Sequence, residues 1–129
     1  MPLSVLTIDD NEDDLLFTRI ALARCGVEYE IHAHQKAQDA LTYLSNTRDH
    51  GVDLILLDIN MPAMNGFEFL DAFEALPPEQ QGRAVVVLLS SSRDATDRDR
   101  AARYASVRGF LTKPLERSDA ARLAALISA

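Results

Sequence analysis

Short apolar runs alternate along the chain with stretches in which apolar residues recur every three or four positions. Residues 52–57 and 84–89 are almost continuous apolar runs, which are typical of strands buried on both faces of a parallel sheet. Residues 3–8 and 109–112 form two further apolar runs, and residues 30–34 form a weaker one. The pattern therefore predicts five strands.

The stretches between these runs predict five helices. The first, residues 13–25, has apolar side chains at helical spacing and is expected to end at Gly26. The apolar positions of this pattern are Leu16, Phe17, Ile20, Ala21, Ala23 and Val27. The other predicted helices cover residues 37–45, 66–76 and 94–105, and a last stretch capped by Ser118.

Strands that alternate with helices in this way predict an α/β fold, in which a five-stranded parallel sheet is doubly wound by five helices. In such folds the ligand site lies just beyond the carboxyl ends of the strands. The residues at those ends are polar or charged: Asp9, Asp10, Asp58, Ser90 and Lys113. We therefore expect these five residues, which are far apart in the chain, to converge at one edge of the sheet.

Length and composition narrow the class of protein. The chain has 129 residues, of which 47% are hydrophobic and 26% charged, and this suits one folded domain. No apolar run approaches the roughly 18–20 residues that span a bilayer. The N-terminus has no secretory pattern, so we expect a cytoplasmic protein. The formal net charge of −7 opposes binding to nucleic acid or to a membrane, because both are polyanions.

The residue types at the expected sheet edge point to phosphoryl chemistry. Three carboxylates that converge on a small volume cannot all stay ionised without a cation. Oxygen ligands with no convergent His or Cys favour Mg²⁺. Lys113 would add a fixed positive charge, and Ser90 a hydroxyl that can donate to an anionic oxygen. In such a setting a carboxylate can act as the nucleophile and form an aspartyl phosphate.

Four motifs in this order resemble the receiver domain of response regulators in two-component signalling. They are I-D-D at 8–10, L-L-D-I-N-M-P-A-M-N-G at 56–66, L-S-S-S at 89–92 and F-L-T-K-P at 110–114. The resemblance extends over essentially the whole chain. It implies a flavodoxin-like receiver fold for residues 1–129 as a single domain with no output domain. It also implies a signalling switch, not an enzyme.

The resemblance assigns a role to each residue of the expected site. Asp58 would accept a phosphoryl group from a sensor histidine kinase or a histidine phosphotransfer protein. Asp9, Asp10 and Asp58 would bind Mg²⁺, together with the backbone carbonyl of Asn60. Lys113 would pair with Asp58 at rest and with the phosphoryl group afterwards.

The resemblance also implies a conformational switch. Ser90 would turn to bond a phosphoryl oxygen, and Phe110, unless it is a plain core residue, would turn inward into the vacated space. We choose Ser90 over Ser91 and Ser92 for this role because it closes the predicted strand. Pro114 would follow a cis peptide bond, as is typical of the family. The residues leave open whether the phosphorylated form binds a downstream protein or passes the phosphate on, and whether the protein forms a homodimer.

The alternative is a small Mg²⁺-dependent phosphohydrolase of the haloacid-dehalogenase type, which also forms an aspartyl phosphate. That family shares the Asp nucleophile, the Ser or Thr and the Lys. It places its nucleophile in a D-x-D motif on the first strand and its acidic pair late. Here that order is reversed, and Asn60 replaces the second Asp of the motif.

The rest of the first acidic cluster has a simpler interpretation. Glu12, Asp13 and Asp14 lie in the first turn of a predicted helix. There a carboxylate interacts favourably with the helix dipole, by about 0.3–1 kcal/mol each. We therefore expect these three residues to be structural.

Overall fold

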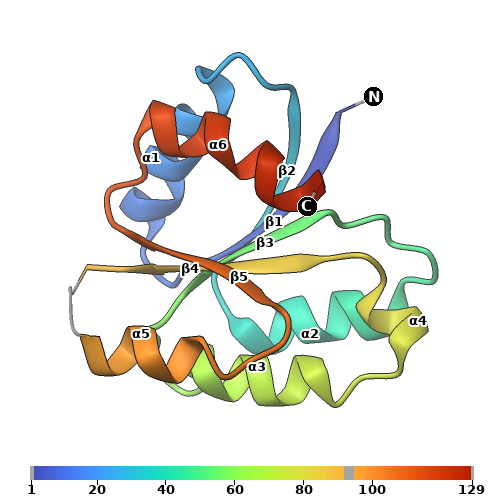
Figure 1. Cartoon of the computed structure of the whole chain (residues 1–129). Coiled ribbons are helices and arrows are strands. Elements are labelled where there is room, and N and C mark those ends of the chain that lie inside the picture. Colours follow the sequence, from blue (N-terminus) through green and yellow to red (C-terminus); the bar gives the residue numbers. More distant parts are fainter. Residues whose placement is uncertain (1, 92–94, 129) are drawn as a thin grey trace.

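The computed structural model describes residues 2–91 and 95–128. Its centre is a five-stranded parallel sheet with the strand order β2-β1-β3-β4-β5 (Figure 1). The strands are β1 (Leu3–Ile8), β2 (Tyr29–His34), β3 (Leu54–Asp58), β4 (Val85–Ser90) and β5 (Val107–Thr112). The helices are α1 (Glu12–Ala23), α2 (Ala37–Asn46), α3 (Gly66–Glu74), α4 (Pro78–Gln81), α5 (Ala95–Ala101) and α6 (Arg117–Ser128). The predicted doubly wound α/β class is confirmed.

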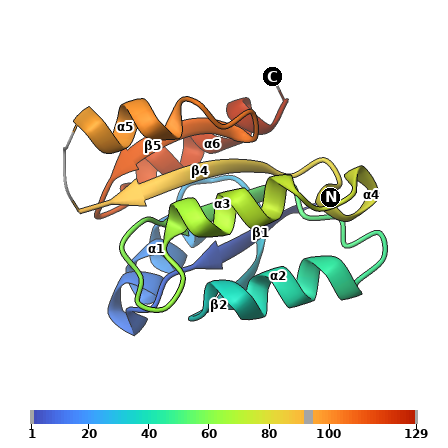
Figure 2. The same ribbon diagram turned by 90° about the horizontal axis from the view of Figure 1, so that it is seen from below.

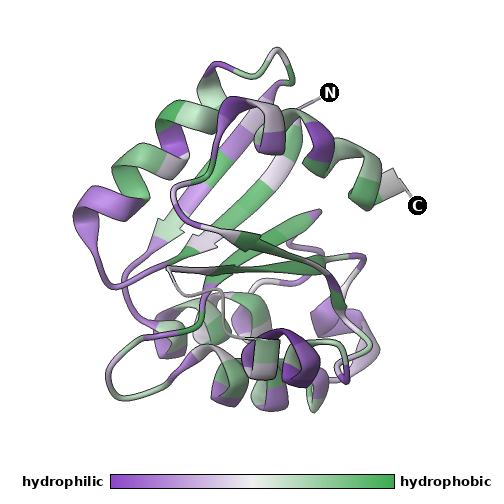
Figure 3. Cartoon of the chain, turned by 60° about the vertical axis from the view of Figure 1, so that its left-hand side comes forward, coloured by the Kyte–Doolittle hydropathy of each residue, from purple (hydrophilic) through white to green (hydrophobic). Residues whose placement is uncertain are grey.

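Helices cover both faces of the sheet. Helices α1 and α6 lie on one face, and α2, α3 and α5 lie on the other (Figures 1 and 2). Every residue of β3 is buried because its side chains alternate between the two layers. Ile55 and Leu57 pack into the core beneath α2 and α3, whereas Leu54 and Leu56 pack into the core beneath α1 and α6. Figure 3 shows most of the sheet coloured as hydrophobic and the helices banded with hydrophilic residues.

Asparagine caps set the start of two helices. The side chain of Asn11 accepts hydrogen bonds from the backbone N–H groups of Asp13 and Asp14, which satisfies two free donors of the first turn of α1. Asn65 forms a capping box with Glu68 at the start of α3. Both caps follow directly on strand ends or turns near the carboxyl edge of the sheet, so they hold the loops of that edge in place.

Gly66 allows α3 to begin close to the end of β3. Its backbone N–H donates to the carbonyl oxygen of Ile59 at 2.9 Å. A Cβ atom at Gly66 would lie 2.9 Å from both the carbonyl oxygen of Asp58 and the Cα of Ile59, which are rigid backbone atoms. The Asn-Gly pair that the sequence marks as a turn is therefore also a point of close backbone approach.

The apolar pattern predicted helix α1 but not the face that it buries. Leu16, Phe17 and Ile20 are 52%, 53% and 38% exposed. The buried residues of the helix are Thr18, Ala21 and Leu22. Apolar residues surround more than half of this helix, so their spacing does not single out the face that packs on the sheet.

The structure has six helices among the described residues, where the sequence predicted five. Pro77 and Pro78 end α3 as expected, but Pro78 also starts the short helix α4. Proline suits a first helical position, where its missing N–H would have no partner within the helix. Helix α5 is shorter than the predicted stretch 94–105, of which residue 94 lies outside the described residues. None of the helices in the described part of the chain is long and apolar enough to cross a membrane.

Candidate functional site

Parallel register brings the ends of neighbouring strands to the same edge of the sheet. Asp58 is the last residue of β3 and pairs with Leu89 of β4. Ser90 ends β4 and pairs with Thr112 of β5. The backbone N–H of Lys113 then donates to the carbonyl oxygen of Ser90 at 2.8 Å. In Figure 2 the arrowheads of β1 and β4 point to the same side of the molecule.

Asp9, Asp10 and Asp58 form an acidic cluster at this edge. One carboxylate oxygen of each lies within 4.8 Å of those of the other two. Asp9 and Asp58 are each 4% exposed, whereas Asp10 is exposed, so the cluster opens to solvent on the Asp10 side. Such a set of oxygen donors, one of them accessible, fits a hard divalent cation such as Mg²⁺.

Asn60 lies exposed just beyond β3. Its backbone N–H donates to the carboxylate of Asp58, which places this stretch of backbone beside the acidic cluster. The proposed ligand role of the Asn60 carbonyl oxygen stays a prediction. The position of the residue next to Asp58 is compatible with it.

Lys113 connects the acidic cluster to helix α1. Its Nζ lies 2.6 Å from Oδ2 of Asp9 and 3.2 Å from Oδ1 of Asp58. It also lies 2.9 Å from Oδ2 of Asp14, in the first turn of α1. The Lys113 side chain is only 12% exposed, so the ammonium is largely enclosed by carboxylates.

Asp14 is the residue of this site that our reading of the sequence missed. We expected it to serve only the first turn of α1, and the structure adds a hydrogen bond to a lysine 99 residues away. Side chains in a helix lean toward its N-terminus, so a carboxylate early in α1 points back toward the strand edge. That lean is the only signal in the sequence that could have suggested the contact.

The pKa values of both central groups are raised, but the main cause differs between them. Burial, helped by the charge of Asp9, raises the pKa of Asp58 from 3.8 to about 6, although Lys113 and the Asn60 N–H oppose the shift. Burial alone would lower the pKa of Lys113, but hydrogen bonds to Asp9 and Asp14 and the charge of Asp58 raise it above its ordinary value. Lys113 therefore keeps its positive charge at neutral pH.

The hydroxyl and aromatic candidates lie on the two strands beyond Asp58. Ser90 is fully buried at the end of β4, and Ser91 is exposed just after it. Ser92 lies outside the described residues. Phe110 of β5 is half-buried, and the Arg98 guanidinium carbon of α5 lies 5.3 Å from the centre of its ring. The Lys113–Pro114 peptide bond is cis, as the resemblance implies.

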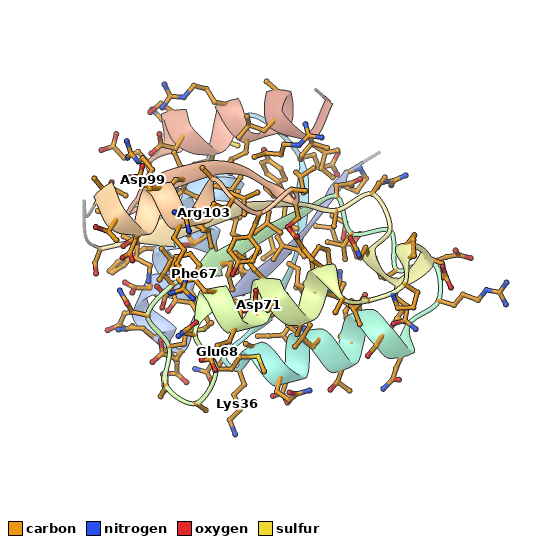
Figure 4. The ribbon with its side chains drawn as sticks, turned by 60° about the horizontal axis from the view of Figure 1, so that its bottom comes forward. Lys36, Phe67, Glu68, Asp71, Asp99 and Arg103 are labelled. Atoms are coloured by element: carbon orange, nitrogen blue, oxygen red, sulfur yellow. The ribbon has the colours of Figure 1, made fainter. Side chains whose placement is uncertain are left out.

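Helix α5, which comes after β4 in the chain, is tied to α3 by aromatic and charged groups. Figure 4 shows Phe67 and Asp71 on α3 beside α5. The guanidinium carbon of Arg100 lies 4.1 Å from the centre of the Phe67 ring, which is a cation–π contact. The hydroxyl of Tyr104, just after α5, donates to Asp71 at 2.8 Å. The C-terminal end of α5 is therefore anchored to α3, the helix that comes after Asp58 in the chain.

Comparisons with known proteins agree with this geometry. The family model described as "Response regulator receiver domain" matches residues 5–125. The two-component response regulator ORR1 of Oryza sativa subsp. japonica is 29% identical over 124 residues, which cover 92% of this chain and 52% of that protein. The chain thus spans about half or less of the curated relatives that it matches.

Solved structures of similar proteins share the whole fold. A two-component response regulator from Cytophaga hutchinsonii superposes with a TM-score of 0.90 at 27% identity, covering 99% of this chain and 98% of that one. A response regulator receiver protein from Dyadobacter fermentans DSM 18053 superposes with a TM-score of 0.86 at 28% identity and covers 98% of each chain.

Proposed function

The chain belongs to the response regulator receiver family of two-component signalling, and on this premise we propose that it is a phosphorylation switch whose acceptor is Asp58. One observation carries the proposal. The Asp58 carboxylate is buried at a strand end, 3.2 Å from the Lys113 ammonium, and lies in a cluster with Asp9 and Asp10. The nucleophile Asp58 therefore lies beside the positive charge of Lys113 and beside oxygen donors that suit a divalent cation.

In the proposed reaction, a carboxylate oxygen of Asp58 attacks the phosphorus atom of a phosphohistidine. The new P–O bond forms as the P–N bond breaks, and the histidine is the leaving group. Mg²⁺ held by Asp9, Asp10, Asp58 and the Asn60 carbonyl would neutralise charge on the phosphoryl oxygens. The Lys113 ammonium neutralises further charge on the phosphoryl group, since it already contacts Asp58.

Phosphorylation then changes the state of the neighbouring strands. The modified Asp58 carries about −1.5 to −2 charges and new acceptor oxygens. The hydroxyl of Ser90 donates to one of these oxygens, and Phe110 turns into the space that Ser90 leaves. Arg98 lies over the Phe110 ring, so helix α5 senses the change. A partner responds only as far as it prefers one of the two states.

The phosphodonor in this proposal is a sensor histidine kinase or a histidine phosphotransfer protein, and the output is binding of a downstream protein or onward phosphotransfer. We propose that residues 1–129 form one receiver domain, which is a switch and not an enzyme. We also propose that the protein works in the cytoplasm, beside this phosphodonor.

The proposal is tested by chemical phosphorylation. Incubation with Mg²⁺ and phosphoramidate, followed by intact-mass measurement, is expected to give a single phosphoryl adduct. The adduct is expected to be absent in Asp58→Asn and in EDTA, and to persist in the control Asp13→Asn, because Asp13 is exposed and outside the acidic cluster. Labelling of Asp58→Asn would refute the assignment. Continuous release of phosphate from many phosphate esters would favour the hydrolase instead.

A further inference from the structure

We infer that Asp14 is a positioning residue that holds the Lys113 ammonium against the phosphoacceptor independently of the metal ligands. The inference rests on the proposed function, because Lys113 acts there on the phosphoryl group. It assigns a specific task to a carboxylate that the sequence pattern explains by its interaction with the helix dipole alone.

The first step is the number of hydrogen bonds that the ammonium can donate. A lysine ammonium has three N–H donors. Its Nζ lies within 3.2 Å of an oxygen of each of three carboxylates, those of Asp9, Asp14 and Asp58. The ammonium donates hydrogen bonds to Asp9 and Asp14, and Asp58 completes the set as an ion-pair partner at 3.2 Å. The long lysine side chain, which would otherwise sample many rotamers, is held in one orientation.

The second step is the difference between the three acceptors. Asp9 and Asp58 belong to the acidic cluster that can hold a divalent cation, and Asp14 does not. A bound cation and a phosphoryl group on Asp58 would compete with Lys113 for the carboxylate oxygens of Asp9 and Asp58. Asp14 then keeps its carboxylate for Lys113 alone, so the ammonium stays anchored in the state in which the reaction occurs.

The third step is the enclosure of the contact. The Lys113 side chain is 12% exposed and that of Asp14 is 35% exposed, so this ion pair is partly shielded from water, more at Lys113 than at Asp14. The contact also joins helix α1 to the segment after β5, two parts of the chain that meet only in the tertiary fold. Such a contact is a better positioning device than an exposed ion pair between flexible side chains.

The test compares Asp14→Asn with Asp13→Asn. Both variants remove one negative charge from the first turn of α1, but the Asp13 side chain is exposed and its described contact is through its backbone. At saturating Mg²⁺, we expect Asp14→Asn to lower the rate of phosphoramidate labelling by about 3- to 10-fold, because the ammonium is no longer held in place. Asp13→Asn is expected to label at the wild-type rate.

A double variant shows whether Asp14 acts through Lys113. In the Lys113→Ala background, the further change Asp14→Asn is expected to leave the labelling rate unchanged, because the group that Asp14 positions is gone. An additive loss in the double variant would instead mean that Asp14 acts by its charge or on the fold, and this would overturn the inference. Equal rates for Asp14→Asn and Asp13→Asn would overturn it as well.

Nitrogen-15 NMR of the lysine ammonium groups gives a readout that needs no phosphorylation. We expect a slowly exchanging Lys113 ammonium signal in the wild type and in Asp13→Asn, and its loss or shift in Asp14→Asn. An unchanged signal in Asp14→Asn would contradict the positioning role. If the wild type itself were not labelled, the proposed function would fail, while this spectrum would still report on the contact.

Discussion

At the scale of single residues, the site is built around a carboxylate that is costly to ionise. Asp58 is buried beside Asp9, and together these effects raise its pKa to about 6 in spite of Lys113. The sequence already suggested that three converging carboxylates need a cation, and the direction of this shift agrees. The same feature that makes Asp58 a candidate nucleophile therefore weakens the folded state when no divalent cation is bound.

Because an ionised Asp58 is costly in the folded state, we expect Asp58→Asn to stabilise the metal-free protein. The folded pKa lies above the usual value, so the contribution of Asp58 to stability is fully present below about pH 4 and is lost as the pH rises through about 6. At pH 7 we expect Asp58→Asn to raise the free energy of unfolding by roughly 1–3 kcal/mol. Urea denaturation in EDTA at several pH values measures this, and a less stable variant would contradict the prediction.

At the scale of elements, the residues that make α1 helical differ from the residues that pack it against the sheet. Its N-cap at Asn11 and its run of apolar residues favour the helix. Its packing depends on Ala21 and Leu22, which face the core beneath α1 and α6. The larger apolar side chains of Leu16 and Phe17 lie on the outer side, where they add little to stability.

A pair of substitutions on α1 tests this assignment of faces. Leu22→Ala is expected to lower the free energy of unfolding by about 2–5 kcal/mol, because Leu22 is fully buried and its loss leaves a cavity. Phe17→Ala, on the same helix, is expected to cost less than about 1 kcal/mol, because half of that side chain already contacts water. Urea unfolding with unchanged m-values measures both. A larger loss for Phe17→Ala would reverse the two faces.

At the scale of the whole molecule, the sheet is what assembles the site. Asp9 and Asp10 follow β1, Asp58 ends β3, and Lys113 follows β5. Parallel pairing of the strands between them aligns these ends, and the two helical layers bury the two faces of the sheet. The acidic cluster is therefore a property of the folded sheet as a whole, and any cation bound there stabilises the whole fold.

This link between fold and cation can be measured. A ligand that binds only the folded state stabilises it by about 1.4 kcal/mol at a free concentration about ten times its Kd. We expect Mg²⁺ to raise the unfolding free energy of the wild type in this way and to have much less effect on Asp10→Ala, which lacks one donor of the cluster. Asp13→Asn serves as the charge-matched control. Equal stabilisation of Asp10→Ala and the wild type would remove Asp10 from the metal site.

Local pattern was enough to predict the strands and the residues at their ends. Continuous apolar runs mark buried parallel strands, and alternation with helices forces those strands to run the same way, so their carboxyl ends share one edge. Asp9, Asp58, Ser90 and Lys113 could be placed at one edge of the sheet on that basis alone. The short helix α4 was missed because Pro77 and Pro78 were interpreted only as a stop, whereas Pro78 is the first residue of this helix.

Only the tertiary structure decided which face of α1 is buried and which distant side chains meet. The spacing of apolar residues predicts that α1 is a helix. Only the packing of α1 on the sheet determines that Leu22 is buried in the core and Phe17 is exposed. Likewise, the acidic run after β1 has the composition of a helix cap, and only the fold brings Asp14 to Lys113. Periodicity and capping depend on residues only a few positions apart in the chain. The Asp14–Lys113 ion pair joins residues 99 positions apart, so it exists only once α1 and the end of β5 are packed together.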